Sequence, residues 1–293
     1  MSKVVCFGEV LWDVFQNGKR IGGAPLNVAM RLAAFGHDVT IISAVGQDEL
    51  GQQLLSYLKK NKLRTDSIQQ LEDYKTGDVQ VSLDKKGVAK YSIEYPRAWD
   101  KIETKASYEI AVQDANAFVF GSLITRDNVS KKTLFSLLEL AHYKVFDLNL
   151  RSPFYDKDIL VYLMEKADFI KFNDEELHEV SSYLGSKYNS LEQNLKFIAE
   201  KTRTKHICVT KGPFGAVLLY NNILYYNSGY KINVVDTVGA GDSFLGSLIS
   251  QLLNKIEPQA AIDFACAVGA LVAQSEGANP LITVEEIERF INP

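Results

Sequence analysis

The amino-acid sequence predicts an α/β protein in which helices cover the faces of a mostly parallel sheet. Short apolar runs rich in β-branched residues alternate with segments whose apolar residues have helical spacing. The strand-like runs span residues 39–45, 117–120, 144–148, 168–171 and 206–210. Because open parallel sheets bind ligands beyond the carboxyl ends of their strands, polar residues near those ends are the candidates for a functional site.

The composition is that of a globular protein with a large core. The chain has 293 residues, of which 46% are hydrophobic and 23% charged, and its formal net charge is −4. This balance rules out a disordered chain. The slightly acidic charge and the absence of a long Lys/Arg run disfavour a nucleic-acid partner.

Cysteine usage and the N-terminus indicate a cytoplasmic protein. Cys6, Cys208 and Cys266 each lie in an apolar run, where we expect buried thiols, and their odd number argues against a disulfide framework. The sequence has no Cys/His pattern with zinc spacing. The N-terminus lacks the pattern of a signal peptide, and no apolar stretch reaches the length of a membrane span.

Two segments interrupt the alternation, at 11–21 and 76–95, and both are typical of antiparallel hairpins. The second alternates apolar and polar residues around a turn at 85–87. Its apolar positions are Val79, Val81 and Leu83. A small inserted sheet has one face to cover, so we expect either a lid over a ligand or a dimer contact.

A glycine-rich turn, DTVGAGD at 236–242, precedes an apolar-periodic segment that predicts a helix beginning near Asp242. Free amides and the positive end of the helix dipole suit a phosphate group there. An acid at that place would repel phosphate, which favours Asp242 as a general base acting on the hydroxyl that attacks the phosphate. The alternative, that Asp242 only caps the helix, is equally compatible with the residues.

A second glycine pair, Gly22 and Gly23, opens another apolar-periodic helix and permits close approach of a ligand to the backbone. Asn27 offers one acceptor and two donors, which suit vicinal hydroxyls. Asp13 follows the first strand and could accept hydrogen bonds from a sugar hydroxyl. Turn or cap roles are the alternatives for these residues.

Together, GGAPLNVA at 22–29 and DTVGAGD at 236–242 resemble the two signatures of the ribokinase-like (PfkB) carbohydrate kinase family. VGQDELG at 45–51 also matches. So do the N-x-x-E motif of Asn173 and Glu176 and a T-x-G-x-x-G nucleotide turn, so the resemblance covers essentially the whole chain. The segments GEVLWD, AWD and DLNLRSP are similar to those of fructokinases.

The resemblance implies one domain, 1–293, built as a three-layer α/β/α sandwich with a mostly parallel central sheet. Segments 11–21 and 75–97 would form a small β-sheet lid. The implied activity is transfer of the γ-phosphate of ATP to a sugar hydroxyl with Mg²⁺, with D-fructose as the expected sugar. A homodimer through the lid is implied as well.

The family's functional positions transfer residue by residue. Asp242 takes the position of the base. The amides of Gly239, Ala240 and Gly241 form the anion hole, and sugar contacts fall to Asp13, Gly22, Gly23, Asn27 and Arg151. ATP contacts fall to Thr210, Gly212, Gly215, Gly239, Gly241 and, where many relatives have asparagine, Cys266.

The resemblance also implies metal positions. Asn173 and Glu176, spaced i and i+3, would share a helical face and organise Mg²⁺ through water. Their alternative is a helix start with an acid in its first turn. Asp236 and Val238, with the loop at 274–280, match a site for a monovalent cation such as K⁺.

Three other functions stay open at this level. One is a kinase for another small alcohol, such as 2-keto-3-deoxygluconate, ribose or a nucleoside. Another is a non-catalytic sugar-binding regulator, which we would expect to have lost the base or the glycines. A nicotinamide oxidoreductase is disfavoured, because Phe244 occupies the third glycine position of a G-x-G-x-x-G pattern.

Overall fold

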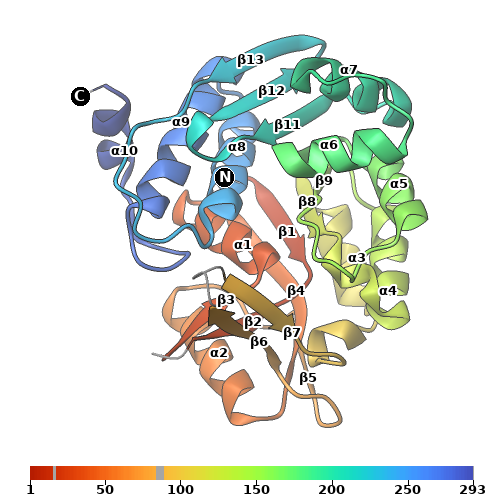
Figure 1. Ribbon diagram of the computed structural model, residues 1–293. Coiled ribbons are helices and arrows are strands. Elements are labelled where there is room, and N and C mark those ends of the chain that lie inside the picture. The colour runs from red at the N-terminus through yellow and green to blue at the C-terminus, as the bar shows by residue number, and fades with distance from the viewer. Residues whose placement is uncertain (16–17, 84–88, 293) are drawn as a thin grey trace.

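The computed structural model describes residues 1–15, 18–83 and 89–292, which form one large and one small sheet (Figure 1). The strand order of the large sheet is β13-β12-β11-β10-β9-β8-β1-β4-β5. Its strands are β1 (Lys3–Phe7), β4 (Asp38–Gly46), β5 (Ile68–Leu71), β8 (Ala117–Gly121), β9 (Lys144–Asp147), β10 (Phe169–Asn173), β11 (His206–Thr210), β12 (Ala216–Tyr220) and β13 (Ile223–Asn227). All pair in parallel from β5 to β11, whereas β12 and β13 are antiparallel. The mostly parallel sheet is confirmed.

Helices cover both faces of the large sheet and make three layers (Figure 1). Because side chains alternate along a strand, Val4 and Cys6 face one core while Val5 and Phe7 face the other. The first core is closed by α1 (Ala24–Ala34), α2 (Glu49–Lys60), α8 (Ala240–Leu253) and α9 (Pro258–Ala273), with α10 (Val284–Ile291) outside α9. The second is closed by α3 (Ala106–Gln113), α4 (Asn128–Leu138), α5 (Lys157–Lys166), α6 (Asp174–Tyr183) and α7 (Leu191–Thr202).

The small sheet has the order β3-β2-β6-β7. Its strands are β2 (Leu11–Phe15), β3 (Gly18–Gly22), β6 (Gly77–Leu83) and β7 (Ala89–Ile93). The two antiparallel hairpin pairings are confirmed, and the hairpins are joined by a parallel pairing of β2 with β6. In the sequence, β2 follows β1 and β6 follows β5. Because β1 and β5 run in the same direction in the large sheet, β2 and β6 leave that sheet in the same direction. Val79 is buried, whereas the turn at 85–87 and the side chains of Val81 and Leu83 lie outside the described residues.

The cysteine prediction is confirmed: Cys6, Cys208 and Cys266 are buried and free. Among the helices that the structure describes, none is long and apolar enough to cross a membrane.

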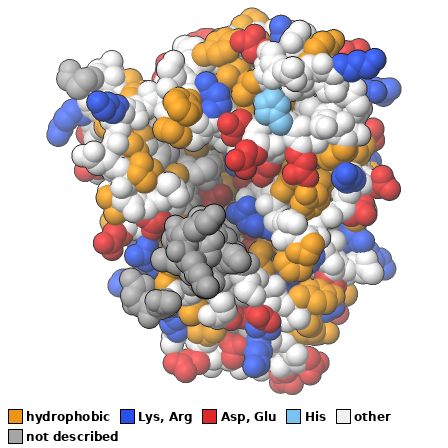
Figure 2. Space-filling view, in the orientation of Figure 1, with side chains coloured by type: hydrophobic (Ala, Val, Ile, Leu, Met, Phe, Trp, Pro, Cys, Tyr) orange, Lys and Arg blue, Asp and Glu red, His pale blue; other side chains and the backbone are white. Residues whose placement is uncertain are grey.

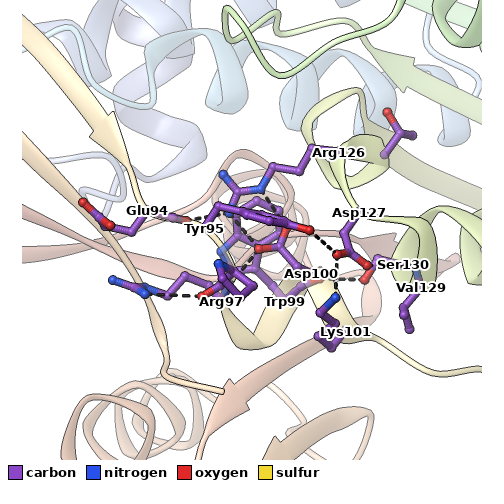
Figure 3. Close-up of polar contacts among 12 residues, drawn as sticks. Glu94, Tyr95, Arg97, Trp99, Asp100, Lys101, Arg126, Asp127, Val129 and Ser130 are labelled. Carbon is purple, nitrogen blue, oxygen red and sulfur yellow. Dashed lines mark hydrogen bonds and ion pairs between the residues drawn. The ribbon is translucent and has the colours of Figure 1, made fainter. Parts of the chain in front are cut away.

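A buried ion pair joins the two short helical turns η1 (Ala98–Lys101) and η2 (Leu123–Arg126), as Figure 3 shows. Arg126 donates to both oxygens of Asp100, over 2.7 and 2.8 Å, and the two side chains are 2% and 0% exposed. The guanidinium lies 4.0 Å from the centre of the Trp99 ring and also donates to the carbonyl oxygen of Glu94. This pair fixes the segment that follows β7 against the segment that follows β8.

We expect Asp100→Ala to destabilise the protein by about 3–5 kcal/mol, because it leaves the guanidinium of Arg126 buried without its charge partner. The exposed ion pair between Lys166 and Glu139 provides the matched control, and Glu139→Ala should cost far less, because solvent screens both of its charges. Urea denaturation of the three proteins measures both effects. Equal losses in the two variants would contradict a structural role for the buried pair.

Candidate active site

Most of the predicted site residues gather where the small sheet meets the carboxyl end of the large sheet and the start of α8. The face shown in Figure 2 is hollowed above the small sheet, and acidic and basic side chains lie at the rim of this hollow. Asn27 of α1 reaches Asp242 of α8, and the charges of Asp147, Lys171 and Arg151 act on the same carboxylate.

Asp242 is not the cap of α8. The helix begins at Ala240, with Gly239 as its N-cap at a φ of 74°. Asp242 lies in the first turn, and its Oδ2 accepts a hydrogen bond from Nδ2 of Asn27 at 2.8 Å. The capping interpretation of Asp242 was therefore wrong. The helix begins earlier than predicted because Gly239 adopts a left-handed conformation, in which a Cβ would also collide with Ala278.

The start of α8 is an electropositive place. The N–H groups of a first helical turn have no acceptor within the helix, and here they belong to the predicted anion-hole residues Gly239, Ala240 and Gly241. The ammonium of Lys171 lies 3.6 Å from the place that a Cβ of Gly241 would take. Amides and ammonium together suit a phosphate group.

Lys171 forms a buried ion pair with Asp147, with 3.0 Å between Nζ and Oδ1. Burial by itself lowers the pKa of Lys171, but the carboxylates of Asp147 and Glu176 outweigh it and raise the pKa above its usual value. The ammonium therefore stays charged. The Oδ2 atom of Asp147 is buried with no hydrogen-bond partner among the described residues.

Three carboxyl groups on the sugar side of the site, those of Asp242, Glu9 and Asp13, have raised pKa values, and burial also raises the pKa of Glu176. Burial, followed by the charge of Asp147, raises the pKa of Asp242 to about 6. Burial raises the pKa of Glu9 to about 7, and burial followed by the charge of Asp242 raises that of Asp13 to about 6. The guanidinium of Arg151 acts against all three shifts. Clusters of acids with raised pKa values are typical of functional sites.

Residues predicted to contact a sugar surround this acidic space. Asp13 lies within β2, opposite Arg20 of β3, so the alternative of a turn role for Asp13 was wrong. A Cβ on Gly22 would collide with the carboxylate of Asp13, and one on Gly23 with the backbone of Glu9. These two glycines therefore permit the close packing of Asp13 and Glu9, whereas the approach of a ligand to their backbone stays a prediction.

The opening of α1 depends on a residue from another element. Gly23 is the N-cap of α1 and has no side chain to offer. Instead, Oε1 of Glu9 accepts a hydrogen bond from the amide of Ala24 at 3.2 Å, while Oε2 is buried without a partner among the described residues. Glu9 thus supports the helix that carries Asn27.

The predicted nucleotide residues lie at the other end of the site. Thr210 ends β11, and Gly212 and Gly215 have positive φ angles of 55° and 75° in the following turn, η3 (Gly212–Phe214). A Cβ on Gly215 would collide with the backbone of Asn227. Cys266 lies on α9, the helix that packs against β12 and β13, and its side chain is buried.

Asn173 and Glu176 form a capping box instead of sharing a helical face. Asn173 precedes α6 in an extended conformation, and its Oδ1 accepts from the amide of Glu176. The two oxygens of Glu176 accept from the amides of Asn173 and Leu150, at 2.8 and 2.9 Å. Within 1–15, 18–83 and 89–292, no three His, Cys, Asp or Glu side chains form a metal cluster. The remaining lone pairs of Glu176 fit a hydrated Mg²⁺ better than a directly bound one.

Asp236 is paired with a residue of the small sheet. Its Oδ1 accepts from the amide of Val238, and its Oδ2 accepts from the amide of Gly277 and from Nη1 of Arg20, the last at 2.6 Å. The guanidinium neutralises the carboxylate that was predicted to bind a monovalent cation. In this arrangement, Asp236 does not fit a second cation.

Sequence reasoning missed four charged residues of the site: Glu9, Arg20, Asp147 and Lys171. Asp147 and Lys171 follow the apolar residues 145–146 and 169–170, at the carboxyl ends of the predicted strands 144–148 and 168–171. Glu9 lies in the GEVLWD segment used for the family resemblance. A charged residue at the carboxyl end of a buried strand was therefore a usable signal. Arg20 carries no such signal.

We expect Glu9→Gln to stabilise the protein at high pH only. Between about pH 4.5 and 7 the native state holds the proton of Glu9 and the unfolded state loses it, so this group destabilises the fold increasingly as the pH rises through that range. Gln removes the charge and can still accept from Ala24. The gain should be on the order of 1–3 kcal/mol at pH 8 and near zero at pH 4.5, measured by urea denaturation. A gain that does not depend on pH would show that Glu9 is not buried as a charge.

A model of the "pfkB family carbohydrate kinase" matches residues 1–284 of the chain. The chain is 28% identical to "Probable fructokinase-6, chloroplastic" of Arabidopsis thaliana, over 97% of this chain and 80% of that protein.

Two solved structures are similar over the whole chain. One is a double mutant of fructokinase from Vibrio cholerae O395 with fructose, ADP and potassium ion bound, at a TM-score of 0.86, 23% identity and coverage of 100% and 99% of the two chains. The other is the 2-dehydro-3-deoxygluconokinase of Thermotoga maritima, at a TM-score of 0.87, 24% identity and coverage of 100% of both chains. At these identities the likeness concerns the fold, which is ribokinase-like with a large and a small sheet. Since the family model covers nearly all of the described residues and the two signature motifs meet around Asp242, the chain belongs to the pfkB family of carbohydrate kinases.

Proposed function

We propose that this carbohydrate kinase transfers the γ-phosphate of ATP to a hydroxyl of D-fructose. One observation carries the proposal: the hydrogen bond between Asn27 and Asp242 joins the two signature segments. It places an acid between the predicted sugar residues and the first-turn amides of α8.

Asp242 serves as the general base. With a pKa of about 6 it is ionised at neutral pH yet basic enough to take the proton of a sugar hydroxyl. The amides of Gly239, Ala240 and Gly241 and the ammonium of Lys171 stabilise the charge of the transferred phosphoryl group.

The charges around the sugar side favour a neutral substrate. Arg97 donates from Nε to Asp78 at 2.8 Å, and Arg126 donates from Nε and Nη2 to the two oxygens of Asp100, so each guanidinium already has a carboxylate as its charge partner. The acids Glu9 and Asp13 face the site, with Arg151 as their counter-charge. Carboxylates accept hydrogen bonds from sugar hydroxyls but repel a carboxylate or phosphate on the substrate. This supports fructose over 2-keto-3-deoxygluconate or a sugar phosphate.

The nucleotide lies along the turn that contains Thr210, Gly212 and Gly215 and reaches α9 near Cys266. Its phosphates lie against Gly239 and Gly241. Asn173 and Glu176 hold the water shell of Mg²⁺, which neutralises the phosphate charge when it is bound.

A role for K⁺ at Asp236 and Val238 depends on Arg20. A monovalent cation that binds Oδ2 of Asp236 would have to displace the guanidinium of Arg20, which occupies that oxygen. We propose that Arg20 supplies the positive charge at this place unless such a cation binds.

Segments 11–21 and 75–97 act as the lid over the sugar. Two contacts fix this sheet to the body: Arg20 bonds to Asp236, and Nε1 of Trp12 donates to the carbonyl oxygen of Leu50 at 3.0 Å. The same small sheet is our proposed contact in a homodimer, because β3 and β7 are edge strands within the described part of the chain.

The test is an ATP-consumption assay with D-fructose, D-glucose, D-ribose, 2-keto-3-deoxygluconate and adenosine. We expect the highest kcat/KM with D-fructose, because a neutral ketose offers hydroxyl donors and no anion to the acids of the site. A tenfold higher kcat/KM with 2-keto-3-deoxygluconate or with adenosine would refute the assignment of fructose. No ATP consumption with any acceptor would refute the kinase mechanism itself.

A matched pair of variants shows whether turnover occurs at this site. Asp13→Asn should lower kcat/KM for the sugar at least about tenfold, because a charged acceptor of a sugar hydroxyl is lost. Asp66→Asn changes an exposed aspartate remote from β2 and should leave kcat/KM unchanged. Equal values for the two variants would place the sugar elsewhere.

A further inference from the structure

The amide of Asn27 bridges the base and a residue near the C-terminus. Its Nδ2 donates to Oδ2 of Asp242, and its Oδ1 accepts from Nδ2 of Asn279, each over 2.8 Å. No sequence motif singled out Asn279. We propose that Asn279 is a positioning residue that holds Asn27 in the orientation in which it donates to Asp242. The inference rests on the proposed role of Asp242 as the base.

The direction of this chain of hydrogen bonds follows from its chemistry. An ionised carboxylate only accepts hydrogen bonds, so Asn27 must turn its NH₂ group toward Asp242. Its carbonyl oxygen then points away and needs a donor inside the protein, because Asn27 is only 3% exposed. Asn279 is that donor. Without it, the buried carbonyl oxygen of Asn27 has lost the donor that satisfies it and holds the amide in place, so the hydrogen bond from Asn27 to the carboxylate of Asp242 is weakened.

The loop that carries Asn279 is fixed against the start of α8 by independent contacts. Arg31 donates to the carbonyl oxygen of Pro280, and the hydroxyl of Ser243 donates to the carbonyl oxygen of Ala278. Gly277 bonds to Asp236, as described above. These contacts place Asn279 beside Asn27 although the two residues are 252 positions apart.

The base sits among several charges, and Asn27 is one of the groups that favour its ionised form. Burial and the carboxylate of Asp147 oppose ionisation. The hydrogen bond from Asn27 and the charges of Lys171 and Arg151 favour it. The carboxyl groups of Glu9 and Asp13 face the same space and repel the charge of Asp242. Loss of the oriented amide should therefore raise the pKa of the base.

The test is the pH dependence of kcat/KM for Asn279→Leu. We expect its acid limb to move up by about one pH unit, so that kcat/KM at pH 6 falls about tenfold more than at pH 8.5. The control is Ser275→Ala. Ser275 lies in the same loop as Asn279, but its hydroxyl donates to the carbonyl oxygen of Leu271 in α9 and not to Asn27. Its acid limb should match that of the wild type.

A direct titration separates this inference from the proposed function. In protein labelled with ¹³C at aspartate carboxyl groups, the Asp242 signal is assigned by its loss in Asp242→Asn. It should titrate about one pH unit higher in Asn279→Leu, whether or not the protein phosphorylates a sugar. An unchanged midpoint in a folded Asn279→Leu protein would overturn the proposal, and so would an equal shift in Ser275→Ala. If Asn279→Leu does not fold, Asn279→Ala gives the same comparison.

Discussion

The structure of the site depends on one constraint: several carboxylates must stay close together beside a helix start that attracts phosphate. Asp242 and Asp147 repel each other, and Glu9 and Asp13 add two further acids. Such a cluster is tolerated only where cations and donors are held in fixed positions. Lys171, Arg151 and Asn27 meet this need from β10, from the segment after β9 and from α1. Burial, together with this repulsion, raises the pKa of Asp242 to about 6.

The fold supplies these positions through contacts between distant segments. Asn27 and Asp242 lie on α1 and α8, which pack together over the same face of the large sheet. The loop before α10 contacts α8 through Ser243 and α1 through Asn27, so the C-terminal part of the chain completes the site. Arg20 joins the small sheet to the same region through Asp236. Asp242, its hydrogen-bond donor Asn27 and the small sheet are therefore parts of one connected structure.

Local sequence patterns predicted the parts of this arrangement that depend on local conformation. The alternation of strands and helices gave the parallel sheet, and the two glycine motifs gave the openings of α1 and α8, because glycine permits backbone conformations that other residues avoid. Spacing alone placed Asn173 and Glu176 on one helical face, whereas Asn173 caps the helix. The contacts of Arg20 and Asn279 join residues 216 and 252 positions apart and were beyond any local pattern. The family resemblance supplied the role of Asp242, while the structure supplied its neighbours.

The central claim is that the acid at the start of α8 removes the proton of the attacking hydroxyl, and the most direct measurement is kcat of Asp242→Asn with saturating ATP and sugar. Asn keeps the size of the side chain and can still accept the hydrogen bond of Asn27. The account predicts that the melting temperature and the affinity for ATP are retained while kcat falls by about 10²–10⁴. If the variant keeps more than about a tenth of the wild-type kcat, the barrier has changed by less than about 1.4 kcal/mol. Asp242 would then not be the base.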